Sequence, residues 1–416
     1  MPEEIIRRIL RLTGYEVHRY EFDETVSTVT LWIKQVGADP FHTCRGCGIG
    51  TRRVHSRSER RVRDLPWGEW KVWLVVTMHR VKCRRCGVSS ERIDWLEGNP
   101  FTRRFSAAVA RDCEDAAVSR VASKWGLSCR TVRRIDKRAL QEWSESRKRQ
   151  PLRHMGVDEI FWKKGACLTV VSDLQAGEPI WAGRERKKET LDRRLPPRRR
   201  RAVRAVCVDM WKPFLQSLRE HLPRAAIVID KFHVMKHVNA AVDETRRQEF
   251  FRQRGRLRAV VRGKRWLFLT RWSRLTKAKR GELNEVFVLN RRLFKAYSLK
   301  EQIERLWSYT YEGAARTFFT DWVRSLRWQR LPAFKKLAAT LTRHLEGILN
   351  YCRHKVPFGV VEAINANIRS VIRRGRGYRD HEYLILKVQR STARARLERA
   401  AWMNTQSQIP PQSDLS

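Results

Sequence analysis

The hydrophobic positions of the first hundred residues predict mostly strands. A helical repeat covers residues 5–10, and hydrophobic and polar residues alternate along 25–34. Residues 60–80 resemble a β-hairpin, with Pro66 and Gly68 near the turn. We therefore expect a strand-rich N-terminal domain over residues 1–100.

Residues 101–150 change to helical spacing, and two of the predicted helices have the offsets of a helix-turn-helix. Ala122 would lie where the helices touch, and Gly126 would make the tight turn. Ser128 would cap the second helix, with Val132 and Ile135 buried beneath it. A plain helical hairpin is the alternative interpretation. The run 144–151 is predicted to be a linker.

The second helix of this pair is basic on its outer side. Side chains in that position can reach phosphates and base edges in the major groove of DNA. The residues predicted to contact DNA are Arg130, Thr131, Arg133, Arg134 and Lys137.

From residue 151 onward, predicted strands alternate with helices. Three consecutive strands are followed by a helix, a fourth strand, a second helix and a fifth strand, which is the order of a ribonuclease-H-like fold. In that fold the first and fourth strands lie side by side. The predicted strands are 155–162, 166–173, 179–184, 202–208 and 225–229, and the predicted helices are 187–195 and 213–221.

Residues 241–345 read entirely as helix. Their aromatic residues recur at helical spacing, and we interpret most of them as core. Trp272 and Trp307 are candidates for stacking on an unpaired base. A further helix, with a hydrophobic stripe from Val360 to Val371, lies within 346–400.

These elements predict an α+β multidomain protein. A ribonuclease-H-like α/β core over 151–240 and 346–400 would be interrupted by an all-helical insertion over 241–345. The core would follow the N-terminal domain and the helix-turn-helix region. The polar tail, 401–416, is expected to be disordered.

Three acidic residues stand at the edges of these elements. Asp158 interrupts the first strand, Asp209 follows the fourth, and Glu362 opens the late helix. A carboxylate at the edge of a buried strand is costly unless it binds a cation or finds donors. Carboxylates on strand, strand and helix suit two Mg²⁺ ions, with Mn²⁺ as an alternative, acting on a phosphodiester. The sequence therefore predicts these three residues as catalytic metal ligands.

Asp230 competes with Asp209 for the second position, because it also follows an apolar strand. The strand count favours Asp209, whose strand is the fourth and would lie against the first. The strand before Asp230 is the fifth and would lie further out. Asp230 and His233 would then support the site or position DNA, or would simply cap and pair locally.

Four cysteines are paired by their spacing, Cys44 with Cys47 and Cys83 with Cys86. The two pairs are joined through the predicted hairpin, an arrangement typical of a zinc ribbon in which four thiolates hold one Zn²⁺ tetrahedrally. Because such a site has no open position, we expect the ion to be structural.

The chain is strongly basic, with 88 Lys and Arg against 44 Asp and Glu and a formal net charge of +44. A polyanion such as double-stranded DNA is therefore the expected partner. No stretch approaches about 18 apolar residues and none resembles a signal peptide, so we expect no membrane contact and a cytoplasmic protein.

Several further segments complete this pattern. They are Arg63-Asp-Leu-Pro66, Gly156-Val-Asp-Glu159, Val208-Asp-Met-Trp-Lys-Pro-Phe214, Asp230-Lys-Phe-His233 and Gly359-Val-Val-Glu-Ala-Ile-Asn365. Together with the two cysteine pairs, their order and spacing resemble insertion-sequence transposases of the ISL3 type, which have a DDE catalytic core. The resemblance runs from about residue 36 to about residue 395. One departure follows Glu362, where Ala-Ile-Asn-Ala replaces the Gly-Leu-Asn-Asn expected for the family.

The resemblance implies a bacterial, nucleoid-associated transposase. Such an enzyme binds the terminal inverted repeats of its element, cuts at the ends and joins them to target DNA, as a homodimer or higher oligomer. Cleavage and strand transfer are both in-line displacements at phosphorus, so Asp158, Asp209 and Glu362 would serve both steps without a covalent protein intermediate.

Other functions explain less of the chain. A transcriptional regulator derived from a transposase would use only the N-terminal third and leave the three carboxylates unexplained. A ribonuclease-H-like nuclease or resolvase would use the carboxylates but not the large N-terminal region. A structural packaging protein would account for the charge alone.

Overall fold

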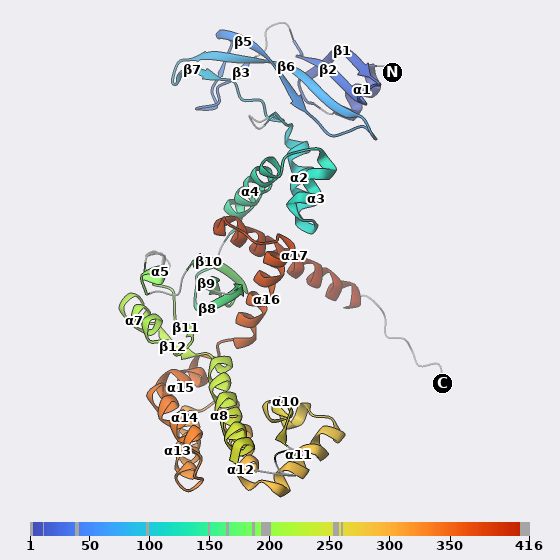
Figure 1. Ribbon diagram of the computed structural model, residues 1–416. Coiled ribbons are helices and arrows are strands. Elements are labelled where there is room, and N and C mark those ends of the chain that lie inside the picture. Colours follow the sequence, from blue (N-terminus) through green and yellow to red (C-terminus); the bar gives the residue numbers. More distant parts are fainter. Residues whose placement is uncertain are drawn as a thin grey trace, which may run out of the picture. The chain divides into compact units, whose positions relative to one another are not determined.

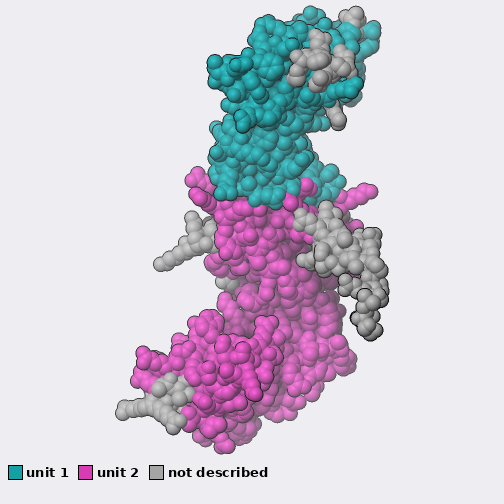
Figure 2. Space-filling model, turned by 90° about the vertical axis from the view of Figure 1, so that its right-hand side faces the viewer, with its two compact units in different colours: residues 1–147 teal, residues 148–416 magenta. Residues whose placement is uncertain are grey.

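The structure is a computed structural model that describes residues 3–10, 12–37, 41–96, 100–148, 150–163, 166–184, 188–192, 201–252, 258 and 261–407 (Figure 1). The chain forms two compact units, Met1–Arg147 and Lys148–Ser416, coloured separately in Figure 2. The boundary falls within the predicted linker, although helix α4 (Cys129–Ser146) continues further into that segment than expected.

The first unit is built on a sheet with strand order β1-β2-β6-β5, and β7 also pairs with β6. The predicted hairpin is confirmed, because β5 and β6 pair antiparallel and Gly68 has a positive φ in the turn between them. Strand β1 was not predicted, because none of its side chains is buried and no alternation results. The elements are α1 (Glu3–Leu10), β1 (Tyr15–Asp23), β2 (Thr28–Gln35), β3 (His42–Thr43), β4 (Gly50–Thr51), β5 (Val54–Arg63), β6 (Lys71–Cys83) and β7 (Gly87–Ser90).

Asp64 joins this sheet to the helices that follow. The carboxylate is fully buried and accepts hydrogen bonds from the Thr102 hydroxyl at 2.7 Å and from the Arg104 guanidinium. Arg104 also donates to the carbonyl oxygen of Leu10 at 2.6 Å. The Arg63-Asp-Leu-Pro66 segment therefore has a structural role, because it connects β5, α1 and α2 (Arg103–Asp115).

The helices α2, α3 (Val118–Trp125) and α4 have the predicted turn and cap. Gly126 ends α3 with φ of 58°, a conformation that suits glycine. The Ser128 hydroxyl accepts a hydrogen bond from the Thr131 N–H at 3.1 Å and caps α4. Ala122, Val132 and Ile135 are buried as expected.

The second unit contains a sheet with strand order β10-β9-β8-β11-β12. Strand β11 pairs in parallel with β8 on one side and β12 on the other, so the predicted neighbourhood of first and fourth strands is confirmed. The strands are β8 (His154–Lys163), β9 (Ala166–Asp173), β10 (Glu178–Arg184), β11 (Ala205–Val208) and β12 (Ala226–Ile229).

Helices cover both faces of this sheet. Along β11, Val206 and Val208 belong to one core cluster, with α7 (Lys212–His221) and α8 (Lys231–Arg252). Ala205 and Cys207 belong to the opposite cluster, with α16 (Phe358–Arg374) and α17 (His381–Ser407). This division follows from the alternation of side chains along a strand. By the same alternation, Asp158 lies on the face of β8 that carries Ile160, and Asp209 continues the face of Ala205 and Cys207. Both aspartates are therefore on the side of the sheet that α16 covers.

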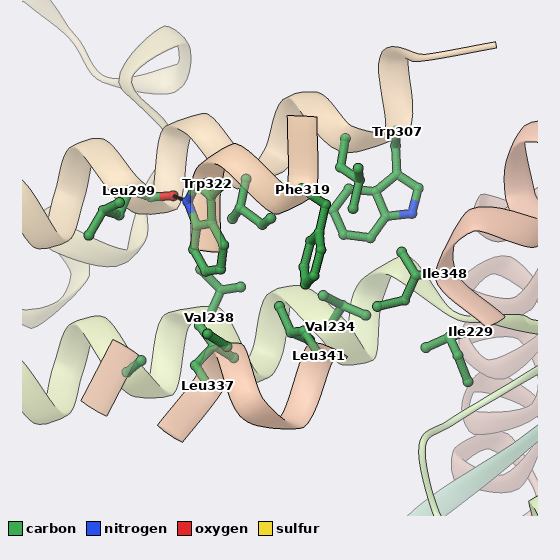
Figure 3. Close-up of a cluster of buried hydrophobic side chains, with 14 of the residues drawn as sticks. Ile229, Val234, Val238, Leu299, Trp307, Phe319, Trp322, Leu337, Leu341 and Ile348 are labelled. Atoms are coloured by element: carbon green, nitrogen blue, oxygen red, sulfur yellow. Dashed lines mark hydrogen bonds between the residues drawn. The ribbon is translucent and has the colours of Figure 1, made fainter. Parts of the chain in front are cut away.

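The elements described within 241–345 are all helices, as predicted, and several of them pack against α8. Figure 3 shows Phe319 and Trp322 against side chains of α8 and α14, with the Trp322 indole N–H donating to the Leu299 carbonyl oxygen at 3.1 Å. Trp307 is also buried, so its proposed stacking on a base is wrong. Trp266, expected in the core, is 72% exposed. The helices are α10 (Arg265–Leu269), α11 (Lys277–Leu289), α12 (Arg291–Glu304), α13 (Glu312–Ser325), α14 (Pro332–Arg343) and α15 (Leu345–His354), with 3₁₀ helices η1 (Trp272–Arg274), η2 (Arg305–Ser308) and η3 (Leu326–Trp328).

Two predicted boundaries differ from the structure. The first predicted helix of the core is short, α5 (Lys188–Asp192), and residues 193–195 lie outside the described residues. Helix α17 extends to Ser407, into the tail predicted to be disordered, and residues 408–416 again lie outside the described residues. None of the described helices is long and apolar enough to span a membrane.

Candidate active site

Asp158 and Asp209 occupy neighbouring positions on parallel strands. Val208 of β11 pairs with Val157 of β8, so each aspartate is the residue that follows one member of this pair. Both side chains are partly accessible, 17% exposed for Asp158 and 24% for Asp209. The structure thus brings the two predicted aspartates together at one edge of the parallel strands.

His233, near the start of α8, lies between the two carboxylates. Its Nε2 is 3.3 Å from Asp158 Oδ1, and its Nδ1 is 3.7 Å from Asp209 Oδ1. Asp209 Oδ1 also accepts a hydrogen bond from the backbone N–H of Met210 at 2.6 Å. The imidazole therefore lies within 4 Å of both carboxylates.

Helix α16 reaches the site through Asn365. Its side-chain amide donates to Asp158 Oδ2 at 2.5 Å, and Asn365 itself is buried. Glu362 is three residues earlier, so it lies on the same side of the helix, and its side chain is exposed. Asn365 is not among the site residues predicted from the sequence. The signal that could have identified it is its three-residue spacing from Glu362.

Asp230 is the third aspartate of this sheet edge, but it is enclosed. It follows Ile229, which pairs with Val208, and it is only 4% exposed. Its carboxylate accepts a hydrogen bond from the Phe232 N–H at 3.0 Å, at the start of α8. Burial raises the pKa of Asp230 to about 6, and the negative charges of Asp158 and Glu362 act in the same direction.

The donor set at this edge consists of hard carboxylate oxygens, which suit Mg²⁺ or Mn²⁺. Among the described residues, however, Asp158, Asp209 and Glu362 do not form a group with ligand atoms all within 4.8 Å of one another. His233 lies between the two aspartates instead. The ligand chemistry of the site therefore fits divalent cations. Its three carboxylates are further apart than the ligand atoms of one metal ion would be.

The four predicted zinc ligands do converge. Their sulfur atoms all lie within 4.8 Å of one another, from Cys44, Cys47, Cys83 and Cys86. The Cys47 backbone N–H lowers the pKa of Cys44 to about 6, which favours the thiolate. At Gly46 an added Cβ would lie 3.2 Å from the Cys86 sulfur, so a larger residue would crowd the cluster. This is the ligand set of a structural zinc site.

The residues predicted to contact DNA lie on α4. Arg130, Arg133 and Arg134 are exposed, whereas Thr131 and Lys137 are half-buried. Thr131 is engaged in the cap, because its hydroxyl lies 2.9 Å from that of Ser128. The accessible part of the predicted surface is therefore the group of three arginines.

Comparisons with known proteins agree with these features. The family model for ISL3-type transposases, described as "Transposase", matches residues 155–388. A second model, the zinc-finger of transposases IS204, IS1001, IS1096 and IS1165, matches residues 40–86. These two matches cover the sheet with the aspartates and all four clustered cysteines.

Two curated relatives are similar over most of their length. The transposase for insertion sequence element IS1001 of Bordetella parapertussis is 32% identical over 391 residues, covering 90% of this chain and 94% of the relative. The transposase for IS1557 of Mycobacterium tuberculosis is 27% identical over 358 residues, covering 78% and 80%. The chain belongs to the ISL3 family of insertion-sequence transposases, DDE enzymes that cleave DNA strands and join them to new positions.

Proposed function

We propose that this transposase binds the terminal inverted repeats of its own insertion sequence and cuts and transfers strands with Asp158, Asp209 and Glu362. The observation that carries the proposal is the juxtaposition of Asp158 and Asp209 on adjacent parallel strands, facing the helix that bears Glu362. The strand order, three antiparallel strands followed by two parallel ones, supports a ribonuclease-H-like core.

The three carboxylates would hold two Mg²⁺ ions, which would activate water or a 3′-hydroxyl and stabilise the leaving oxygen. Asn365 fixes one oxygen of Asp158 and leaves the other directed at His233. His233, which lies near both aspartates, would help to position them before DNA arrives. The exposed Glu362 would approach the aspartates when DNA and cations bind.

End recognition belongs to the first unit in this proposal. The turn at Gly126 and the cap at Ser128 support a helix-turn-helix, with α4 as the recognition helix. Its exposed arginines would contact bases and phosphates, and Zn²⁺ at the four cysteines would stabilise the neighbouring strands. Because an element has two ends, a homodimer or higher oligomer would join them.

A plasmid excision assay tests this function. A supercoiled plasmid would carry a marker between the inverted repeats that flank the gene, and purified protein would be added with Mg²⁺. We expect excision and joining by the native protein and none by Asp158→Asn or Glu362→Gln, while both variants still retard the end fragment in a gel. Cleavage that persists in both variants would exclude the proposed site.

A further inference from the structure

Beside the four cysteines, the first unit contains a second cluster of metal-binding side chains. One ligand atom from each of His42, His79 and Glu91 lies within 4.8 Å of the others. His42 Nδ1 is 2.8 Å from Glu91 Oε2, and His79 Nδ1 is 3.0 Å from Glu91 Oε1. The two imidazole rings are 4.1 Å apart, centroid to centroid. None of these residues belongs to a predicted site.

The backbone segments that carry the cysteines also carry this cluster. His42 is two residues before Cys44, and His79 is four residues before Cys83 on β6. Even spacing along extended backbone puts both members of a pair on the same face. Glu91 follows the Cys86 knuckle and pairs with the Cys44 position in an isolated bridge. Three segments therefore each contribute to both clusters.

The donor atoms are of the kind that a zinc-like ion needs, and they lie close together. Two imidazoles and one carboxylate form a recurrent zinc ligand set, which leaves a fourth position open. With bonds of about 2.0–2.1 Å, tetrahedral ligands lie about 3.3 Å apart. The 2.8 and 3.0 Å separations, which join the two imidazoles to different Glu91 oxygens, are hydrogen-bond lengths slightly shorter than this. The Cys47 and Cys83 sulfur atoms show a comparable contraction, at 3.5 Å against about 3.8 Å for zinc-bound thiolates.

Burial makes a compensating charge at this cluster favourable. Only 3% of the Glu91 side chain is exposed, with 5% for His42 and 13% for His79. Taking a carboxylate out of water is costly, and a nearby cation offsets that cost. A divalent cation would neutralise the Glu91 carboxylate and engage all three residues. His79 also lines a pocket of about 220 Å³ with Tyr15 and Arg57.

We propose that His42, His79 and Glu91 form a second metal site, which binds Zn²⁺ or a similar transition-metal ion beside the four-cysteine site. The ion would connect β3, β6 and the segment after β7, whereas the cysteines stand just after β3, at the end of β6 and just before β7. Each chain would then hold two zinc ions in its first unit. The alternative is a metal-free network in which Glu91 only accepts hydrogen bonds from the two imidazoles and the His79 backbone N–H.

Metal content separates these two possibilities. The full-length chain would carry Asp158→Asn and Asp209→Asn, so that the catalytic carboxylates do not capture zinc. It would be purified without chelators, dialysed and analysed for zinc per chain. We expect two equivalents in this parent, one in Glu91→Gln and one in His79→Asn. His55→Ala is the matched control, because His55 is an exposed histidine on the neighbouring strand β5, and it should keep two.

Cobalt provides a readout that does not depend on the variants folding. The parent, stripped of zinc and titrated with Co²⁺, should take up two equivalents. Only one should produce thiolate-to-metal charge-transfer absorption, and the other should show weaker d–d bands alone. One equivalent of either metal in the parent would overturn the proposal. So would two equivalents in a folded Glu91→Gln variant with an unchanged cobalt spectrum.

Discussion

Three aspartates occupy successive positions across the parallel strands of the second sheet, and their burial differs. Asp158 and Asp209 are open enough to meet a cation and DNA, whereas Asp230 is enclosed and accepts a hydrogen bond at the start of α8. A carboxylate that serves in this reaction must reach a metal ion that also contacts the phosphodiester. Burial therefore supports the choice of Asp209 over Asp230, which the sequence had made by counting strands.

The first prediction compares these two residues. We expect Asp209→Asn to abolish Mg²⁺-dependent cleavage of end DNA while end binding survives, because the fold keeps its shape and loses only a metal ligand. Asp230→Asn should retain measurable cleavage. A cleavage gel with labelled end fragments measures both. The opposite result, a normal Asp209→Asn and an inactive Asp230→Asn, would show that the second carboxylate has been misassigned.

The second prediction concerns stability and pH. The pKa of Asp230 is about 6 in the folded protein and about 3.9 in an unfolded chain. Between these values the folded state binds more protons, so stability falls as pH rises from about 4 to about 6. A shift of about two pKa units corresponds to a cost of about 3 kcal/mol above that window.

Asp230→Asn should remove this cost, because the amide oxygen can still accept from the Phe232 N–H. In metal-free buffer we expect the variant to unfold at a higher urea concentration than the unsubstituted protein at pH 7.5, with the difference disappearing near pH 4. The exposed Asp321→Asn serves as control and should change little at either pH. An equal gain at both pH values would contradict the assigned cause.

The site could be predicted from the sequence only in part. The pairing of Asp158 with Asp209 follows from strand order, which hydrophobic patterns indicate well. The contact of Asn365 with Asp158 joins residues 207 positions apart. It depends on how α16 packs against the sheet, and no local pattern specifies that packing. The place of His233 between both aspartates likewise requires the orientation of α8.

At the scale of elements, strands with buried faces were predictable and exposed ones were not. Strands β8, β9 and β12 appear close to their expected bounds, because their apolar runs enter the core. Strand β1 has no buried side chain, and its backbone pairing with β2 is what makes it a strand. Helix α8 begins directly after Asp230, within the segment that the sequence left unassigned before the insertion.

The third prediction tests the recognition helix. Arg130→Ala and Arg133→Ala should each weaken specific end binding by about 1–3 kcal/mol, if each arginine makes a bidentate base contact. Arg138→Ala is the matched control, because Arg138 lies further along α4 and pairs with Glu142 at 3.1 Å. Footprinting on the terminal repeat measures the effect. Wild-type protection by both variants would exclude α4 as the reading element.

In the proposed function, the whole molecule combines general attraction to DNA with a separate means of recognising a sequence. A net charge of +44 favours binding to any duplex. Each phosphate contact adds about −0.9 to the slope of the logarithm of the binding constant against the logarithm of the salt concentration. The first unit has the turn, cap and cysteine cluster, and the second has the carboxylates. The proposed function therefore assigns sequence recognition to the first unit and catalysis to the second.

The last prediction divides the chain at the boundary between these units. The core clusters around Leu74 and Phe105 consist of residues from 1–147, and those around Phe268 and Ile368 consist of residues from 148–416. Each fragment should therefore fold when expressed separately. We expect 1–147 to prefer the terminal repeat over scrambled DNA at physiological salt, and 148–416 to bind both alike. Gel retardation against competitor DNA measures this preference. Sequence preference residing in 148–416 instead would mean that the catalytic unit reads the element ends.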